Sequence, residues 1–196
     1  FSTAQVAALH GGILGLSTTE EIAAISPRAI TGLDINAISS PSQIAALKPA
    51  QIAAMTAAQI GTFLDTQLAL FDPDQMGALT AAQLGGLSTG QIAAFDATQI
   101  AAIDTKAIAG LTATQITAWD ETQTGALTTA QIGAMSAAQV AGFQVADIEN
   151  FSTGQIAAIS TRAVSGLTTD AIGALDEPQI AGMSNAQIAA LTTTQI

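Results

Sequence analysis

The sequence predicts an all-α solenoid of short helices, in which eight-residue units follow one another and three units make a 24-residue superhelical coil. Three observations support this prediction. Nearly the whole chain repeats one phrase, which consists of an apolar residue, a Ser, Thr or Asp, two small or polar residues, Gln, Ile and two small residues. Each phrase starts as a helix starts, and bulky residues recur every 24 positions, which is typical of a repeat architecture.

The start of each unit resembles a helix N-terminus. In the unit 95–102, Asp96 has the side chain of an N-cap, and Gln99 follows three residues later, which is the spacing of a capping box. Phe95 and Ile100 stand where a hydrophobic staple would close. Proline follows the predicted cap in four units, at the helical position where its missing N–H costs little: Pro27, Pro41, Pro49 and Pro73.

The period of eight excludes a single long helix and a strand. In one α-helix, eight residues rotate by about 800°, so each Ile would drift by roughly 80° from the last and form no stripe. In a strand, the Ile and the next apolar residue, three positions on, would face opposite ways. We therefore predict a short helix and a corner in each unit. Because such helices do not persist alone in water, the units must stack.

The 24-residue spacing marks the coil and its core. Phe71, Phe95, Trp119 and Phe143 are 24 apart, and so are Asp72, Asp96 and Asp120. The predicted core comprises Phe71, Phe95, Ile100, Trp119, Thr124 and Phe143, and the predicted capping pair is Asp96 with Gln99. Thr124 replaces the expected Ile five residues after Trp119, and a small residue opposite a large one would keep the local volume constant.

Residues 1–196 read as one solenoid domain with two parts. Residues 1–42 are irregular repeats, with one short unit at 10–16 and a spacing of six between 37 and 43, which is either a tightened corner or kink or a tolerated deletion. Residues 43–196 keep the octapeptide phase, with Gln replaced only by Ala107, Asp147, Ala163 and Ala171. A start without Met and an end inside a repeat are typical of a fragment of a longer protein.

Composition narrows the classes of partner. The net charge is −11 with four basic residues, which argues against nucleic acid or an anionic membrane surface. No run of 18 apolar residues is present, so we expect no membrane insertion. The absence of Cys excludes disulfides and thiolate metal sites. An acidic, thiol-free repeat suits a periplasmic or extracellular, cell-surface setting.

Few residues suggest chemistry, and we predict no catalytic residue, cofactor or metal site. His10 is the only histidine and has no ligand partners near it. The acidic pairs could bind Ca²⁺ or act as acid and base, but acidic residues also suit the first turn of a helix. These pairs are Asp72 with Asp74, Asp120 with Glu121, and Asp176 with Glu177. Residues 147–150, after Gln144 in a cap position, are a contact site or a solvated face.

The phrases LSTGQIAA, LTTAQIGA and MSAAQVAG resemble the octapeptide tracts of large proteobacterial surface and secreted proteins. Within that group, the chain is similar to the C-terminal repeat region of a magnetotaxis-associated protein of magnetic spirilla. The resemblance implies a helical solenoid with a role in magnetotaxis or cell-surface interaction, and it transfers no functional residue.

The sequence thus favours a non-enzymatic scaffold for protein–protein interaction, with an unknown protein partner. One alternative is an adhesive or spacer segment of a cell-surface protein, and another is a module that binds Ca²⁺ or another ligand. The sides should be smooth and acidic, so binding along them should be weak singly and strengthened by multivalency. An unpaired apolar face at 192–196 predicts end-to-end self-association.

Overall fold

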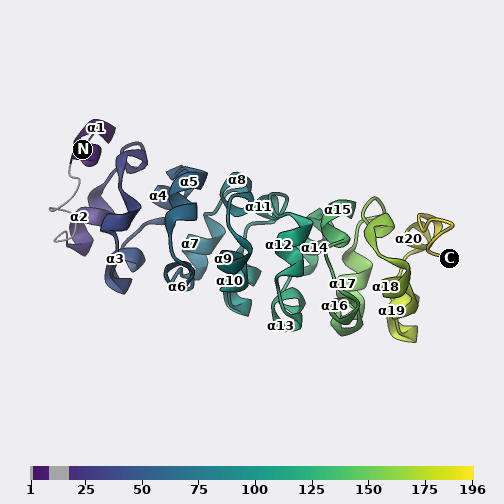
Figure 1. Cartoon of the computed structure of the whole chain (residues 1–196). Helices are drawn as coiled ribbons and strands as arrows, with labels where there is room; N and C mark the ends of the chain where they lie inside the picture. The colour runs from purple at the N-terminus through teal and green to yellow at the C-terminus, as the bar shows by residue number, and fades with distance from the viewer. Residues whose placement is uncertain (1, 9–17) are drawn as a thin grey trace.

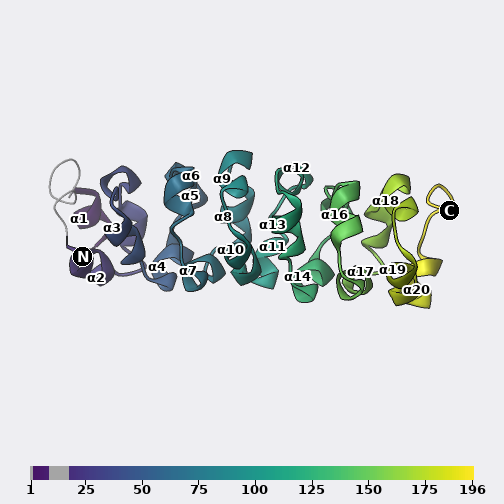
Figure 2. The same cartoon turned by 90° about the horizontal axis from the view of Figure 1, so that it is seen from below.

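The computed structural model describes residues 2–8 and 18–196, and all regular structure in these residues is helical. The α-helices have four to six residues each, and corners join them into an elongated superhelix with the two termini at opposite ends (Figures 1 and 2). This arrangement confirms the predicted all-α solenoid. His10 and the whole of the short unit at 10–16 lie outside the described residues.

The helices form three sides of the superhelix, and along each side most elements contact the one in the next coil. Side one comprises α1 (Thr3–Ala8), η2 (Ile30–Gly32), α4 (Pro49–Ala54), α7 (Pro73–Gly77), α10 (Ala97–Ala102), α13 (Glu121–Gly125), α16 (Val145–Asn150) and α18 (Thr169–Gly173). Side two comprises α2 (Thr19–Ala24), α3 (Pro41–Ala45), α6 (Asp65–Leu68), α9 (Thr89–Ala93), α12 (Ala113–Thr117), α15 (Ala137–Val140), η4 (Val164–Gly166) and α20 (Asn185–Ala189). Side three comprises η3 (Ile35–Ala37), α5 (Ala57–Thr62), α8 (Ala81–Gly85), α11 (Thr105–Ile108), α14 (Thr129–Ala134), α17 (Thr153–Ala158) and α19 (Glu177–Gly182).

The helices begin with the capping boxes that the sequence predicts. At α10 the Gln99 N–H donates to Asp96 Oδ1 over 2.7 Å, and the Asp96 N–H donates to Gln99 Oε1 over 3.1 Å. Pro41, Pro49 and Pro73 are the first residues of α3, α4 and α7.

The prediction of a helix starting at Pro27 was wrong. This proline lies in a turn that leads into the 3₁₀ helix η2. Ala29 occupies the glutamine position of this unit and has no side chain to accept the N–H of Ser26, but the missing glutamine alone does not prevent an α-helix, because α11 and α18 have Ala107 and Ala171 at the same position. Ala163, ahead of η4, repeats the same exception.

The shortened spacing near residue 37 forms a tightened corner. The apolar positions Ile30, Ile35 and Ile44 are five and nine positions apart, instead of eight. The 3₁₀ helix η3 lies here, and Asp34 Oδ1 accepts the Asn36 N–H at its start over 3.1 Å. Because η3 still contacts α5, the stacking of side three continues through the deletion.

The core is a continuous column inside the three sides. Ile100 and Thr124 are fully buried, and the structure places Phe71, Phe95, Trp119 and Phe143 in the same core, at most 5% exposed. The indole Nε1 of Trp119 donates to the carbonyl oxygen of Ile92 over 3.0 Å, which satisfies its only polar group. None of the helices in the described part of the chain has the length and apolarity that a membrane crossing needs.

The repeated glutamine links each coil to the one before it. In addition to its capping contact, Gln99 uses Nε2 to donate to the carbonyl oxygens of Leu68, over 3.0 Å, and Phe71, over 2.8 Å. These acceptors lie 31 and 28 residues earlier, Leu68 in the fourth unit back and Phe71 at the start of the third, so each bond spans slightly more than one 24-residue coil. We call this repeated arrangement the glutamine ladder.

The ladder extends through nearly the whole described chain. Gln67 donates to one such carbonyl oxygen, that of Ile38. Two or more acceptors in the preceding coil are bonded by Gln51, Gln59, Gln75, Gln83, Gln91, Gln99, Gln115, Gln123, Gln131, Gln139, Gln155, Gln179, Gln187 and Gln195. Most of these side chains are buried, where an unpaired amide would be costly. The ladder is missing its glutamine at Ala107, Asp147, Ala163 and Ala171.

Candidate functional site

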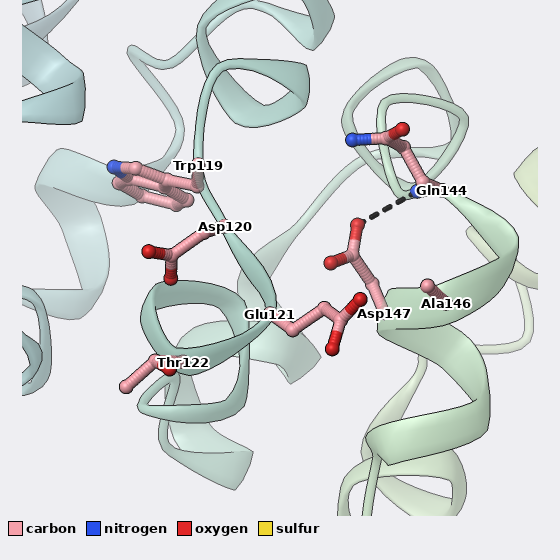
Figure 3. Close-up of a pocket in the computed structure, with 7 residues that line it drawn as sticks. All are labelled: Trp119, Asp120, Glu121, Thr122, Gln144, Ala146 and Asp147. Carbon is pink, nitrogen blue, oxygen red and sulfur yellow. Dashed lines mark hydrogen bonds between the residues drawn. The ribbon is translucent and has the colours of Figure 1, made fainter.

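A surface pocket of about 290 Å³ lies where the glutamine ladder is broken at position 147. It is formed between α13 and α16, two neighbouring elements of side one (Figure 3). The lining residues are Trp119, Asp120, Glu121, Thr122, Gln144, Ala146 and Asp147.

Asp147 makes the contact between α13 and α16 differ from the other contacts between coils, because it replaces the repeated glutamine. The carboxylate is 1% exposed, and its Oδ2 accepts the Gln144 N–H over 2.7 Å, the contact drawn in Figure 3. This hydrogen bond is one half of a capping box, the half in which the third helical residue accepts the N–H of the cap residue. A carboxylate has no N–H, so it cannot donate to the carbonyl oxygens of Ile116 and Trp119, which stand in the ladder-acceptor positions for residue 147. The shorter side chain also fills less of the joint than glutamine would.

Thr124, which replaces the isoleucine of the repeat, is the partner of Asp147. Its hydroxyl donates to Asp147 Oδ1 over 2.8 Å, from a fully buried position in the preceding coil. The sequence suggested that a small residue at 124 offsets the volume of Trp119, and the structure gives it a polar reason as well. A buried carboxylate needs hydrogen-bond donors, and an isoleucine at 124 could not supply one. The detectable signal was that positions 124 and 147 both depart from the repeat and are separated by nearly one coil.

The remaining carboxylates at the pocket also have local partners. Asp120 caps α13, with its Oδ1 accepting the Gln123 N–H over 2.8 Å. Glu121 accepts a hydrogen bond from Asn150 Nδ2 over 3.1 Å. Among the seven lining residues the only hydroxyl is that of Thr122, and there is no histidine. Its chemistry is that of a hollow rich in oxygen acceptors.

The acidic residues singled out in the sequence take different positions. In 147–150, Asp147 is buried whereas Glu149 and Asn150 are exposed, so the segment is not wholly a solvated face. Asp72 and Asp176 are the N-caps of α7 and α19. Over residues 2–8 and 18–196, no three His, Cys, Asp or Glu side chains come together in a group that could hold a metal ion.

A second pocket lies at another break in the ladder. It has a volume of about 540 Å³ and is lined by residues 133–137 and 160–162, immediately before Ala163. Alanine at 163 cannot reach the carbonyl oxygens of Ile132 and Met135, the acceptors that a glutamine there would bond. Arg162 gives this hollow a positive charge, in contrast to the acidic one. Each of these two pockets therefore lies beside a position at which the ladder lacks its glutamine.

The outer surface is charged unevenly among the three sides. From α7 onward, side one has seven exposed carboxylates: Asp72, Asp74, Asp96, Asp120, Glu121, Glu149 and Asp170. Over the same part of the chain, Lys106 lies in α11 on side three and Arg162 lies in the turn before η4 on side two. Side one is therefore a long acidic stripe with no base among its helices from α7 to α18.

Comparison with known proteins finds similarity to a repeat family in two parts of the chain. A family profile described as the ALTTAQ repeat matches residues 68–105 and 140–177, both within the regular part of the chain. No curated protein matches the chain, and no solved structure matches it either. The two matched stretches show a repeat region of this type.

Proposed function

We propose that the chain is a non-enzymatic repeat scaffold that binds partner proteins along its sides. The observation that supports this most directly is the acidic stripe of side one, which presents carboxylates in successive coils. A rigid array of like charges at a regular spacing suits an extended partner with basic residues, because complementary charge steers and orients association.

Each contact along such a side should be weak. Strong interfaces usually rely on aromatic and arginine anchors, and Trp119, the only tryptophan, is 2% exposed. Affinity must then come from several coils engaging one partner, which multiplies weak contacts when the spacing matches.

The first test measures binding of oligolysine peptides of increasing length by calorimetry at low and moderate salt. We expect affinity to grow steeply with peptide length and to fall with salt. An affinity that saturates at a peptide spanning one coil would contradict multivalent binding.

A matched pair of variants separates the acidic stripe from net charge. Asp72→Ser with Asp96→Ser removes two charges from side one, and serine keeps the capping oxygen. Asp104→Ser with Asp176→Ser makes the same change at two caps of side three. We expect the first pair to weaken binding more than the second. Equal effects would mean that the partner senses only the total charge.

The proposal includes a biological setting. The acidic, Cys-free composition supports a periplasmic or cell-surface location, and the resemblance to a magnetotaxis-associated repeat region supports a role in magnetotaxis. Deleting the gene in its host and measuring alignment of swimming cells in a magnetic field tests that role. Exposed apolar residues near the C-terminal end further support end-to-end self-association.

A further inference from the structure

The unit 63–70 carries two exposed leucines at positions where the regular repeat has no other large apolar residue. Leu64 stands at the cap position and is 63% exposed, and Leu70 stands at the last position and is 44% exposed. From residue 43 on, every other cap position holds Ser, Thr, Asp, Lys or Gln, and every other last position holds Ala, Gly, Thr or Asn. Neither leucine belongs to the buried core or to the apolar side chains packed against it.

The fold alone does not explain a leucine at either position. At the start of α6, the Gln67 side chain still accepts the Leu64 N–H over 2.8 Å, but leucine has no oxygen to accept an N–H in return, as the Thr56 hydroxyl does at the start of α5. At the last position, a small residue such as Ala94 leaves less apolar surface in water than Leu70 does. Both departures from the repeat cost stability, so we looked for a contact outside the chain that would use them.

The two leucines lie at the two ends of α6, just ahead of the acidic stripe. Leu64 is the N-cap of this four-residue helix, and Leu70 follows its last residue by two positions. A helix of four residues is only about 6 Å long, so one short peptide segment can reach both of its ends. Asp72, the first carboxylate of the stripe, comes two residues after Leu70. We call Leu64 and Leu70 the leucine pair.

The surroundings of the leucine pair are acidic. Asp65 is exposed in the first turn of α6, and Asp72 and Asp74 are exposed at the start of α7. No basic residue occurs in the sequence between Lys48 and Lys106. A segment that covers the leucine pair therefore lies next to carboxylates, and the complementary segment combines positive charge with an apolar side chain.

We propose that the leucine pair is the apolar anchor for a basic partner segment, which places an apolar side chain on the pair and Lys or Arg side chains on the neighbouring carboxylates. The charge complementarity described above argues for this occupant. The proposal rests on the proposed binding of a basic partner along side one, and it adds a register. A regular row of carboxylates gives a partner several equivalent positions, whereas the leucine pair occurs once and selects one of them.

Two oligolysine peptides test the anchor by calorimetry with the whole chain. One peptide has two leucines near its centre, and the other has serines in the same places, so their charges are equal and a difference in affinity reports the apolar contact. We expect the leucine peptide to bind about tenfold more tightly, because it buries the two exposed leucines. The ratio of the two affinities should hold as salt rises, since salt screens only the charges.

A double variant removes the anchor without removing charge. Leu64→Thr with Leu70→Ala restores residues that the repeat carries at these positions, so the fold should be kept, which circular dichroism checks. This variant should bind the two peptides equally, and it should bind the serine peptide as tightly as the wild type does. The matched control is Val145→Thr in α16, which changes an exposed apolar residue of another unit and should leave the preference for leucine unchanged.

Equal affinities of the wild type for the two peptides, or a preference for leucine that survives in the double variant, would overturn the proposal. So would a preference that Val145→Thr abolishes as fully as the double variant does. The serine peptide reports on the acidic stripe separately. If only the leucine peptide binds, and only when the leucine pair is present, the anchor stands and binding along the stripe is wrong. If both peptides bind equally, the stripe stands and the anchor is wrong, and if neither binds, both proposals fail.

Discussion

Replacing Gln99 with glutamate isolates the contribution of the glutamine ladder. Glutamate preserves the length of the side chain and the oxygen that accepts the Asp96 N–H, so the capping box of α10 is retained. It removes the Nε2 donor that bonds the carbonyl oxygens of Leu68 and Phe71. The substitution thus breaks the link to the preceding coil while keeping the local helix start.

The expected loss is large because the site is buried. Gln99 is 3% exposed, and each of its two cross-coil hydrogen bonds contributes a net of about 0.5–1.5 kcal/mol. A carboxylate facing two carbonyl oxygens adds a desolvation and repulsion cost, so we expect a total of about 3–5 kcal/mol at neutral pH. Because coils couple to their neighbours, unfolding should begin at the joint between α6 and α10.

The destabilisation should depend on pH. The carboxyl at 99 is more stable protonated in the folded state, since only the protonated form can donate to a carbonyl, so its folded pKa is raised above the ordinary value of about 4.3. The variant should therefore lie nearest to wild type below about pH 4 and lose stability as pH rises through the folded pKa.

Urea unfolding followed by circular dichroism and by Trp119 fluorescence measures the effect. The matched control is Gln5→Glu, which keeps the cap at Ser2 and changes an exposed side chain rather than a buried one. We expect the control to cost less than about 0.5 kcal/mol. Equal costs for the two variants, or a cost at 99 that does not vary with pH, would refute the role assigned to the amide.

Substitutions at other positions test the close packing of the coils, the core and the Thr124–Asp147 pair. Gly110→Ala would drive a Cβ into the backbone of Ala81 and should cost about 1–3 kcal/mol, whereas Gly125→Ala meets nothing within 4 Å and should be neutral or stabilising in thermal melts. Ile100→Asp buries an unpaired charge and should cost several kcal/mol, with hydrogen exchange first increased around α10; an unchanged melting temperature would contradict its place in the core. The double variant Asp147→Gln with Thr124→Ile should restore the ladder and raise the melting temperature by more than either change alone.

The fold could be predicted from the sequence because the repeat is regular. The period of eight, the capping pair Asp96 and Gln99, and the regular spacing of bulky residues together predict the stacked coils that the structure shows. The helix start at Pro27 was mispredicted because a cap and a proline can also begin a turn and a 3₁₀ helix, and the alanine at the glutamine position does not distinguish the two, since α11 forms over Ala107.

The second function of the glutamines was not predicted, for a physical reason. A capping box accepts Glu as readily as Gln, so the box alone does not reveal whether the free amide has a partner. The signal lay in the strict absence of Glu at this position after residue 42, while Glu21 occupies it in the first coil. The Thr124–Asp147 pair was missed because each exception was interpreted by itself.

The span of the glutamine ladder has a consequence for how such a chain folds. Every link closes a segment of similar length, because the acceptors lie 26 to 31 residues before the donor, whether the solenoid has few coils or many. The entropy lost in closing a loop grows with the logarithm of its length, so this cost per link is set by the repeat and does not grow with the chain. Folding rate falls as contacting residues become more distant in sequence, and here that distance has a ceiling. Whole coils can therefore be added to or removed from such a gene without making any single step of folding slower.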